Sequence, residues 1–325
     1  MPELPEVETV RIGLQALLPG RKVAGVESDW PKSFPDSEAD VEKFLIGAKV
    51  VAVTRRAKVL IIELSSKYSL VIHLKMTGQL VFVGRQSLSS SRKRGSSQKG
   101  NSFNDWIPNQ VGNDNSEGSG VRFGAGHPNE SLIGELPDKS TRVTLTFSDG
   151  SKLFFNDQRK FGWMRLLPTA EVPQIDFLKK LGPEPLSTDF TWQVMRERLQ
   201  RRPNTNIKAA LLDQTVIAGI GNIYADESLW GAEIHPQTLV KNLSDAKIKK
   251  LYESLVAVLK LSIEKGGSTD KSYVNAEGKR GSYLTFANVF RREGQPCPRC
   301  GTTIIKTKVA GRGTHICPKC QRLTT

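Results

Sequence analysis

The first residues of the chain, MPELPEVETVR, could carry out chemistry at the chain's own amino end. If Met1 is removed, which a small second side chain permits, Pro2 becomes a free secondary amine. Such an amine can attack an aldehyde-like carbon and form an iminium ion, the Schiff-base chemistry that lysine usually provides. Glu3 could then give a proton to a leaving group or ring oxygen, provided its pKa is raised. The alternative is structural, because Pro5 and Glu6 also suit the first turn of any helix.

All the cysteines fall in one segment, CPRCGTTIIKTKVAGRGTHICPKC. They form two C-x-x-C pairs sixteen residues apart, which are Cys297 with Cys300 and Cys317 with Cys320. Each pair can place two thiolates on one tetrahedral ion, and the intervening length suits a hairpin. The spacing predicts one structural Zn²⁺ rather than two redox pairs, since no βαβ pattern surrounds it. Arg312 and its basic neighbours near the hairpin tip either contact phosphates or are simply solvated.

Three further segments have residue types that suit nucleic-acid binding. GIGNIYADE places glycines and Asn222 ahead of a helical run, where free N–H groups suit a phosphate, although such turns are often packing features. NDQRKFGW sets Arg159 beside Phe161, which is either an apolar wedge between bases or a core residue. In HLKMTG, Met76 follows a strand, and a gap-filling core methionine is the alternative interpretation.

Residues 5–18 are expected to form a helix that places Pro2 and Glu3 just outside its amino end. Short β-branched runs between residues 21 and 84, and a hairpin turning on Asp149-Gly150, predict a sandwich or barrel. The interruption at about 84–136, whose first half is rich in Ser, Gly and basic residues, is interpreted as a disordered or mobile insert. Helical patterns follow Pro168, among them one capped by Ser244. The expected order is a helix and β-domain at 1–168, a helical domain at 169–290 and a metal module at 291–325.

The composition favours a polyanionic partner. Lys and Arg total 47 against 33 acidic residues, which gives a net charge of +14. Such an excess supports binding to nucleic acid through counterion release, although a basic surface without a specific partner is the alternative. No run is long and apolar enough for a membrane span, and the acidic start does not resemble a secretory signal. A cytoplasmic location is therefore expected.

The segments PELPEVETVR, RRAKVLIIEL, HLKMTGQL, NDQRKFG, GIGNIYADE and the paired C-x-x-C motifs occur in this order. Together they resemble the bacterial formamidopyrimidine-DNA glycosylase family over almost the whole chain except the insert. The resemblance implies an α+β multidomain fold. An N-terminal helix and a two-layer β-sandwich would precede a helix–two-turn–helix domain and a zinc ribbon. It also implies a monomeric repair enzyme acting on duplex DNA that contains oxidised purines or abasic sites, and a bacterial cytoplasm with association to the nucleoid.

By resemblance, each matching residue has an expected role. Pro2 would be the nucleophile on the deoxyribose C1′, Glu3 the proton donor and Glu6 a residue that arranges the site. Lys58 would bind phosphate and assist β-elimination. The remaining expectations concern DNA: Met76, Arg159 and Phe161 would fill the space left by the flipped base, Asn222 and Arg312 would grip flanking phosphates, Arg312 would also serve δ-elimination, and Lys208 would lie near the same phosphates.

The chain departs from the family pattern at three places. Gln158 and Lys160 replace a proline and an arginine before the wedge Phe161, and Ser140 stands where the family often has a DNA-contacting His. The segment 266–283 differs from the common Thr-Thr-Leu form of the base-capping loop, so the preferred lesion does not follow from it. The rival function is a non-catalytic zinc-ribbon DNA-binding protein. Such a protein would have no need of a free N-terminal proline.

Overall fold

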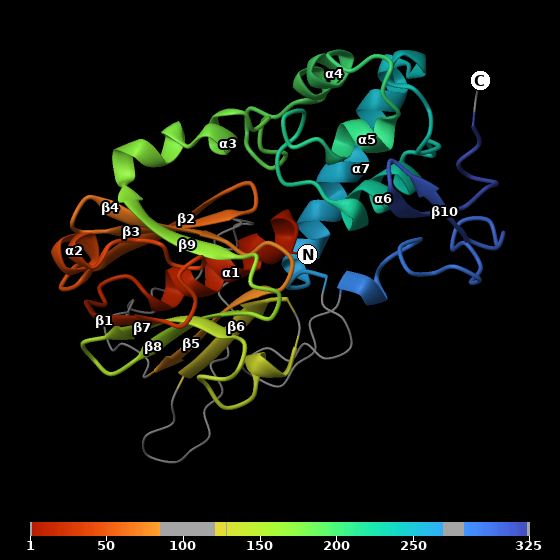
Figure 1. Cartoon of the computed structure of the whole chain (residues 1–325). Coiled ribbons are helices and arrows are strands. Elements are labelled where there is room, and N and C mark those ends of the chain that lie inside the picture. The colour runs from red at the N-terminus through yellow and green to blue at the C-terminus, as the bar shows by residue number, and fades with distance from the viewer. Residues whose placement is uncertain (1, 85–120, 128, 269–282, 324–325) are drawn as a thin grey trace, which may run out of the picture.

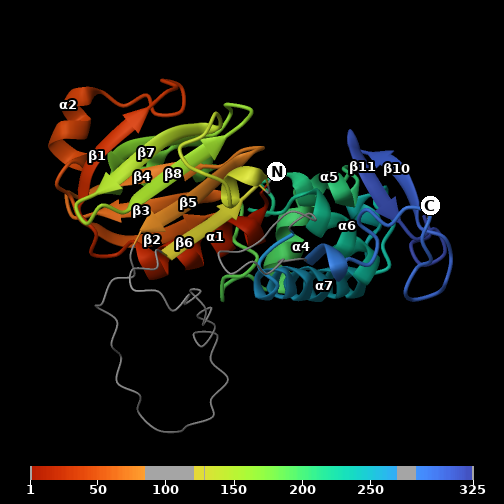
Figure 2. The ribbon, with the colours of Figure 1, turned by 90° about the horizontal axis from the view of Figure 1, so that it is seen from below.

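The computed structural model describes residues 2–84, 121–127, 129–268 and 283–323. A β-sandwich lies beside a group of helices, and the hairpin that the cysteine pairs flank is attached to the far side of those helices (Figure 1). The amino end of the chain lies between the sandwich and the helices in both views (Figures 1 and 2). Pro2 and Glu3, whose chemistry the sequence predicts, therefore lie at the junction between the sandwich and the helices.

The predicted two-layer sandwich is confirmed. One sheet has the strand order β1-β7-β8-β5-β6 and the other β2-β3-β4-β9, all neighbours being antiparallel. The strands are β1 (Val23–Ser28), β2 (Val50–Arg56), β3 (Val59–Leu64), β4 (Tyr68–His73), β5 (Gly78–Gly84), β6 (Val121–Gly126), β7 (Thr141–Phe147), β8 (Lys152–Asp157) and β9 (Trp163–Pro168). Between β1 and β2 lie α2 (Glu38–Asp40) and the π-turn η1 (Val41–Leu45). The hairpin predicted at Asp149-Gly150 joins β7 to β8, and Gly150 has the positive φ that its turn requires.

The prediction of a disordered or mobile insert at about 84–136 is wrong for the second half of that range. Strand β6 pairs with β5 along its length, and a 3-10 turn, η3 (Glu130–Leu132), follows it. Arg122 fastens this turn by donating to the carbonyls of Ser131, Leu132 and Gly134. The two glycines of VRFGAG argued against a strand at β6, because glycine is depleted in strands. The Ser/Gly/basic tract at 85–120 lies outside the described residues.

Helix α1 (Leu4–Leu17) matches the helix expected at 5–18 to within a residue at each end. Its face of Val7, Val10 and Leu14 is fully buried in the core of the sandwich, as the sequence periodicity predicts, and the helix also contacts α7. Burying each such side chain contributes roughly 1.5–3 kcal/mol. Gly13 lies under the ring of Phe123 from β6, where an added Cβ would clash with the ring. The sandwich and the helical part therefore hold α1 between them.

The chain leaves the sandwich through η4 (Thr169–Gln174) and α3 (Asp176–Lys179) and then forms a helical group. Its elements are α4 (Trp192–Gln200), α5 (Ile207–Leu212), α6 (Asn222–Gly231), η5 (Val240–Asn242) and α7 (Asp245–Glu264). Ser244 caps α7 as expected, accepting a hydrogen bond from the N–H of Lys247. The predicted hairpin consists of β10 (Ile305–Val309) and β11 (Arg312–Ile316), preceded by η6 (Tyr283–Thr285). The domain boundaries expected near residues 168 and 290 stay predictions.

Among the described residues, no helix has both the length and the apolar character needed to cross a membrane.

Candidate active site

The amino end of α1 is seated on the amino end of α6. The N–H of Leu4 donates to the carbonyl of Gly219 at 3.1 Å, and the N–H of Ile223 donates to Oε1 of Glu3 at 3.1 Å. A Cβ on Gly221 would lie 2.1 Å from the carboxyl carbon of Glu3, so only glycine permits this approach. The expectation that this helix start presents free N–H groups to a phosphate is wrong for Ile223, because the carboxyl group of Glu3 occupies it.

For the base excision that the resemblance implies, we expect Gly221→Ala to lower the rate about 100-fold, because a displacement of about 1 Å in a catalytic group can cost that much. The backbone of Gly221, at φ −132° and ψ −165°, tolerates alanine, so the effect would come from displacing Glu3. Single-turnover excision kinetics measure it. The matched control is Gly25→Ala, where an added Cβ meets nothing within 4 Å. Unchanged excision by Gly221→Ala would show that the position of Glu3 is not critical.

The environment of Glu3 suits a proton donor. Its side chain is buried, and this burial raises the pKa to about 7, with nearby Lys58 lowering it and Glu6 raising it. The second oxygen, Oε2, is buried without a hydrogen-bond partner. Near neutral pH a substantial share of Glu3 therefore holds a proton, and Oε2 is the oxygen free to carry it.

Glu6 is held by groups from both parts of the molecule. Its Oε2 accepts from the N–H of Glu3 at 2.7 Å, and its Oε1 accepts from the hydroxyl of Tyr224 at 2.5 Å. The N–H and the hydroxyl of Ser268 also donate to Oε1, each at 2.7 Å. Burial, with the charge of Glu6 second, raises the pKa of Tyr224 well above its usual value, so this tyrosine stays a donor. Glu6 thereby fixes the backbone next to Pro2.

Lys58 projects from the tight turn between β2 and β3. Ala57 in this turn has φ 51°, and its N–H donates to the carboxylate of Glu184, which also pairs with Arg55. The amine of Lys58 donates to the carbonyl of Ile220 at 2.8 Å, and burial lowers its pKa. The linker glutamate thus holds the turn that aims Lys58 at the junction.

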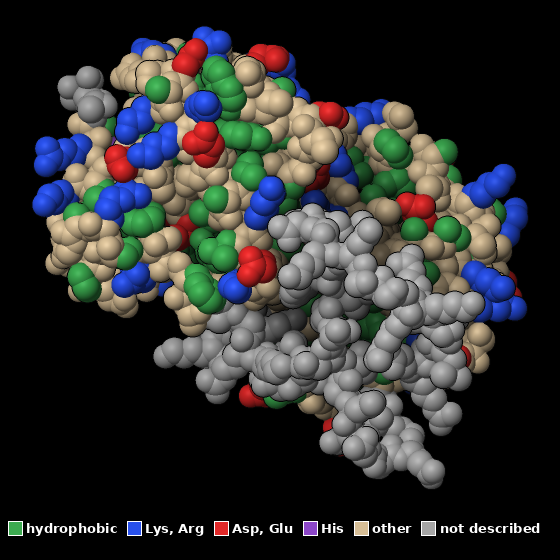
Figure 3. All heavy atoms as spheres, turned by 180° about the vertical axis from the view of Figure 1, so that it is seen from behind, with side chains coloured by type: hydrophobic (Ala, Val, Ile, Leu, Met, Phe, Trp, Pro, Cys, Tyr) green, Lys and Arg blue, Asp and Glu red, His purple; other side chains and the backbone are tan. Residues whose placement is uncertain are grey.

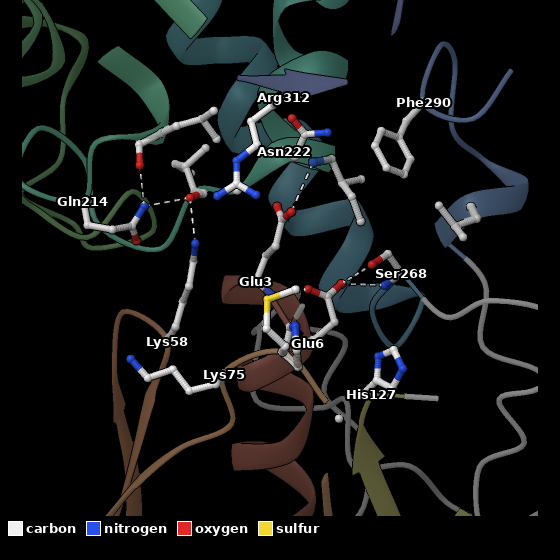
Figure 4. A pocket seen from close by; sticks show the side chains of 18 of the residues that line it. Glu3, Glu6, Lys58, Lys75, His127, Gln214, Asn222, Ser268, Phe290 and Arg312 are labelled. Atoms are coloured by element: carbon white, nitrogen blue, oxygen red, sulfur yellow. Dashed lines mark hydrogen bonds between the residues drawn. The ribbon is translucent and has the colours of Figure 1, made fainter. Parts of the chain in front are cut away.

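These groups meet in one cavity of about 540 Å³. Figure 4 shows Glu3 and Glu6 rising from α1, Lys58 approaching from the strands, and Arg312 reaching down from the hairpin beside Asn222. The Nδ2 of Asn222 donates to the carbonyl of Gly313 at 3.0 Å. The lining includes the predicted site residues Pro2, Glu3, Glu6, Lys58, Met76, Asn222 and Arg312. Four distant segments therefore bring together Pro2, an acid with a raised pKa and basic side chains.

Arg159 and Phe161 lie on the turn between β8 and β9, outside the residues that line the cavity. The ring of Phe161 is 53% exposed, so the core interpretation of this residue is wrong, and the guanidinium of Arg159 lies 4.9 Å from its centroid. Buried Asp157 holds the turn by accepting from the N–H groups of Arg159 and Gly162 and from the hydroxyl of Thr77. An exposed aromatic ring on a fixed turn has the form of a wedge.

If Phe161 acts as the wedge that the resemblance implies, Phe161→Ala should lower kcat/KM on a lesion in duplex DNA about 10-fold, because base stacking worth about 1–3 kcal/mol is lost. On the same lesion in single-stranded DNA the loss should be small, since no partner strand needs to be held open. Comparing the two substrates checks this. Equal losses on both would contradict a wedge role, and Phe177→Ala, which removes another exposed ring, is the control.

The arrangement has close counterparts among known proteins. A family model described as the N-terminal domain of formamidopyrimidine-DNA glycosylase matches residues 1–164, and that of its H2TH domain matches residues 181–273. The formamidopyrimidine-DNA glycosylases of Pelotomaculum thermopropionicum and Pediococcus pentosaceus are 38% and 40% identical to this chain, covering 99% of it and 100% of their own length. The chain belongs to the formamidopyrimidine-DNA glycosylase family.

Solved structures of the glycosylase family support the same assignment. The Fpg of Lactococcus lactis in complex with DNA containing an abasic site is 32% identical, with a TM-score of 0.76. A MutM in complex with DNA containing carbocyclic 8-oxo-G is 33% identical, also with a TM-score of 0.76. Each alignment covers 99% of this chain and 100% of the other. The α+β fold expected from the resemblance is confirmed.

The glycosylase also has the expected metal site. The family model of the zinc finger found in FPG and IleRS matches residues 294–323. The sulfur atoms of Cys297, Cys300, Cys317 and Cys320 all lie within 4.8 Å of one another, which fits four thiolates about 2.3 Å from one Zn²⁺. The prediction of a structural zinc is confirmed. The zinc would hold the two knuckles together below the hairpin that carries Arg312.

The side chain of Lys208 lies in the interior, against the strand that follows Arg312. Its side chain and that of Asp226 are fully buried, and the amine bonds to Asp226 at 2.6 Å. The expected place near the flanking phosphates stays a prediction, while no surface of Lys208 is open to a direct contact with DNA.

Several residues of the glycosylase site were not found from the sequence. Tyr224 and Asp226 lie in the quoted segment GIGNIYADE, but their roles depend on partners far away in the chain. Glu184 lies in a linker between two prolines, where nothing in the sequence points to the Lys58 turn. An odd tyrosine and two acids on an otherwise buried helix were the available signal, since such groups are buried only with partners.

The charge excess is not gathered into one basic patch on the face seen from behind. There, Lys and Arg side chains are spread over both parts of the molecule among acidic ones, where residues of uncertain placement do not cover them (Figure 3).

Proposed function

We propose that this glycosylase excises oxidised purines, 8-oxoguanine and formamidopyrimidines, from duplex DNA and cuts the strand through a Schiff base on Pro2. The observation that carries the proposal is the meeting of Pro2, Glu3, Lys58 and Arg312 around one cavity. A protein that only binds DNA has no need of a buried acid with a pKa of about 7 beside a terminal amine.

Excision begins when the Pro2 nitrogen attacks C1′ and the bond from C1′ to the ring oxygen breaks, the oxygen receiving a proton from Glu3. The nitrogen then loses its own proton, and its lone pair expels the damaged base from C1′. The base leaves with the electron pair of the broken bond and takes up the proton that the nitrogen has lost. An iminium ion joins Pro2 to the opened sugar. Glu6, which accepts from the N–H of Glu3, keeps both end residues in place.

Strand cutting follows from the iminium ion. It acidifies the C2′ proton, whose removal expels the 3′ phosphate, and a second elimination expels the 5′ phosphate. Lys58 and Arg312 line the cavity as cations that would bind the flanking phosphates. Water then releases the sugar fragment and regenerates Pro2.

The base must leave the helix before this chemistry, at a cost of a few kcal/mol. Phe161, Arg159 and Met76 would fill the gap, with Arg159 facing the orphaned cytosine. Zn²⁺ would stabilise the hairpin that presents Arg312, without joining the reaction. The net charge of +14 would hold the enzyme on DNA, and so on the bacterial nucleoid.

The test is an incision assay on a 5′-labelled duplex with one 8-oxoguanine opposite cytosine, beside an abasic-site duplex. We expect base release, followed by a gap with phosphate at both ends. Tight binding to both duplexes without release or cutting would overturn the proposal and favour the non-catalytic DNA-binding protein.

A further inference from the structure

Lys208 is a buried ammonium group whose donors are all used inside the protein. Its Nζ donates to Oδ1 of Asp226 at 2.6 Å, to the hydroxyl of Thr314 at 2.6 Å and to the carbonyl of Gly313 at 3.3 Å. A lysine ammonium has three N–H donors, so none is left for a phosphate. Two of the three acceptors belong to β11, directly after Arg312.

Asp226 and Asn222 on α6 complete this grip on β11. Oδ2 of Asp226 accepts from the N–H of His315 at 3.0 Å, and Asn222 donates to the carbonyl of Gly313. Residues 313–315 are therefore bound by side chains of α5 and α6. We call Lys208, Asp226 and their bonds to residues 313–315 the clamp.

Arg312 directly precedes residues 313–315, the segment that the clamp holds. It opens β11 opposite Val309 in the hairpin, and its side chain is exposed and lines the cavity. A long exposed side chain reaches a fixed point only if its backbone is fixed. The clamp fixes that backbone against α6, the same helix whose start seats Glu3.

The hairpin has a second attachment that does not involve the clamp. The buried carboxylate of Glu227 accepts from the N–H groups of Asn288, Val289 and Phe290, ahead of the first cysteine. Together with the zinc knuckles, this contact would keep the hairpin folded and attached if the clamp were removed. Loss of the clamp should therefore move the tip of the hairpin rather than detach it.

We propose that the buried Lys208–Asp226 pair is a positioning device that holds Arg312 over the lesion site, and that Lys208 does not contact DNA. The consequence for DNA binding rests on the proposed phosphate contact of Arg312. Buried ion pairs often add little to the stability of a protein. The role we assign to the Lys208–Asp226 pair is therefore to fix the geometry of the hairpin tip.

The variant to test is Lys208→Met with Asp226→Asn, because removing one partner alone leaves a buried charge that destabilises strongly. Its control is Arg201→Met with Glu197→Gln, which removes an exposed ion pair of the same charge at the surface of the helical group. Zinc content and thermal unfolding are measured for both. We expect zinc to be retained in both.

The first readout is amide hydrogen exchange of the hairpin at 305–316 in the zinc-loaded protein. In the clamp variant we expect exchange at residues 313–315 to become at least about 10-fold faster, and no change in the control. Unchanged exchange would overturn the clamp, whatever Arg312 does.

The second readout is affinity for a duplex with a tetrahydrofuran abasic analogue, measured against salt. Arg312→Ala and the clamp variant should each lower the salt slope by about one phosphate contact, while all three substitutions together should bind like Arg312→Ala alone. Additive losses would mean that Lys208 touches DNA itself and would overturn the proposal. If Arg312→Ala binds normally, the proposed phosphate contact fails, and hydrogen exchange alone then decides the clamp.

Discussion

Pro2→Gly is expected to lose borohydride trapping on a duplex with one 8-oxoguanine opposite cytosine, with strand cutting reduced on the order of 10³-fold or more. Borohydride reduces an iminium ion to a stable amine, so it records the covalent step directly. Glycine leaves a primary amine on a more mobile end, which can still form a Schiff base but holds it poorly. The native protein should give a covalent adduct with the same duplex.

Two controls make the result specific. The mass of each purified protein shows whether Met1 has been removed, because a retained Met1 blocks the nitrogen and would mimic the variant. An abasic-site duplex tests trapping without any need for base release. If the native protein, with Met1 removed, binds both duplexes tightly yet gives no adduct, the Schiff-base mechanism is excluded.

Patterns local in the sequence predicted much of the fold. The apolar period of α1, the cap at Ser244 and the Asp149-Gly150 turn each depend on a few neighbouring residues, and each appears as expected. Strand β6 was missed because its residues look like a loop, and its pairing partner β5 is needed to make it a strand. Its stability comes from the sheet and from packing on α1, which no local pattern reveals.

The site residues also divide into those that a local sequence pattern predicts and those that depend on distant parts of the chain. The four cysteines were predictable because two short spacings and one loop length decide a tetrahedral site. The burial of Lys208 was not predictable, because a lysine in the first turn after a capping Asn is usually exposed. Here Asp226 and the hairpin enclose it, and both lie far away in the sequence. The residue type alone left Phe161 as either a wedge or a core residue, and the contacts that hold its turn, made by Asp157 with Thr77 and Gly162, come from distant segments.

Replacing Glu3 with a neutral side chain is expected to raise the stability of the fold and to lower the activity. Its folded pKa of about 7 lies above the ordinary 4.5, so the protonated form favours folding. That contribution is fully present below about pH 4.5 and is lost as pH rises through about 7. The shift corresponds to about 3 kcal/mol at alkaline pH. Glu3→Gln, which stays neutral and can still accept from Ile223, should therefore unfold at a higher temperature than the native protein at pH 8.5, with the two converging near pH 4.5.

The same substitution should lower single-turnover release of 8-oxoguanine roughly 10²- to 10⁴-fold, the usual contribution of a general acid. In the native protein, release should fall as pH rises through about 7, since the protonated form is the active one. Cutting at a preformed abasic site should be much less affected, because that sugar already opens to an aldehyde without help. Pro2→Gly loses both reactions, whereas Glu3→Gln should lose mainly the first. If Glu3→Gln released the base at the native rate and kept the native pH profile, the proton would have to come from another group, and the raised pKa of Glu3 would be a consequence of its burial alone.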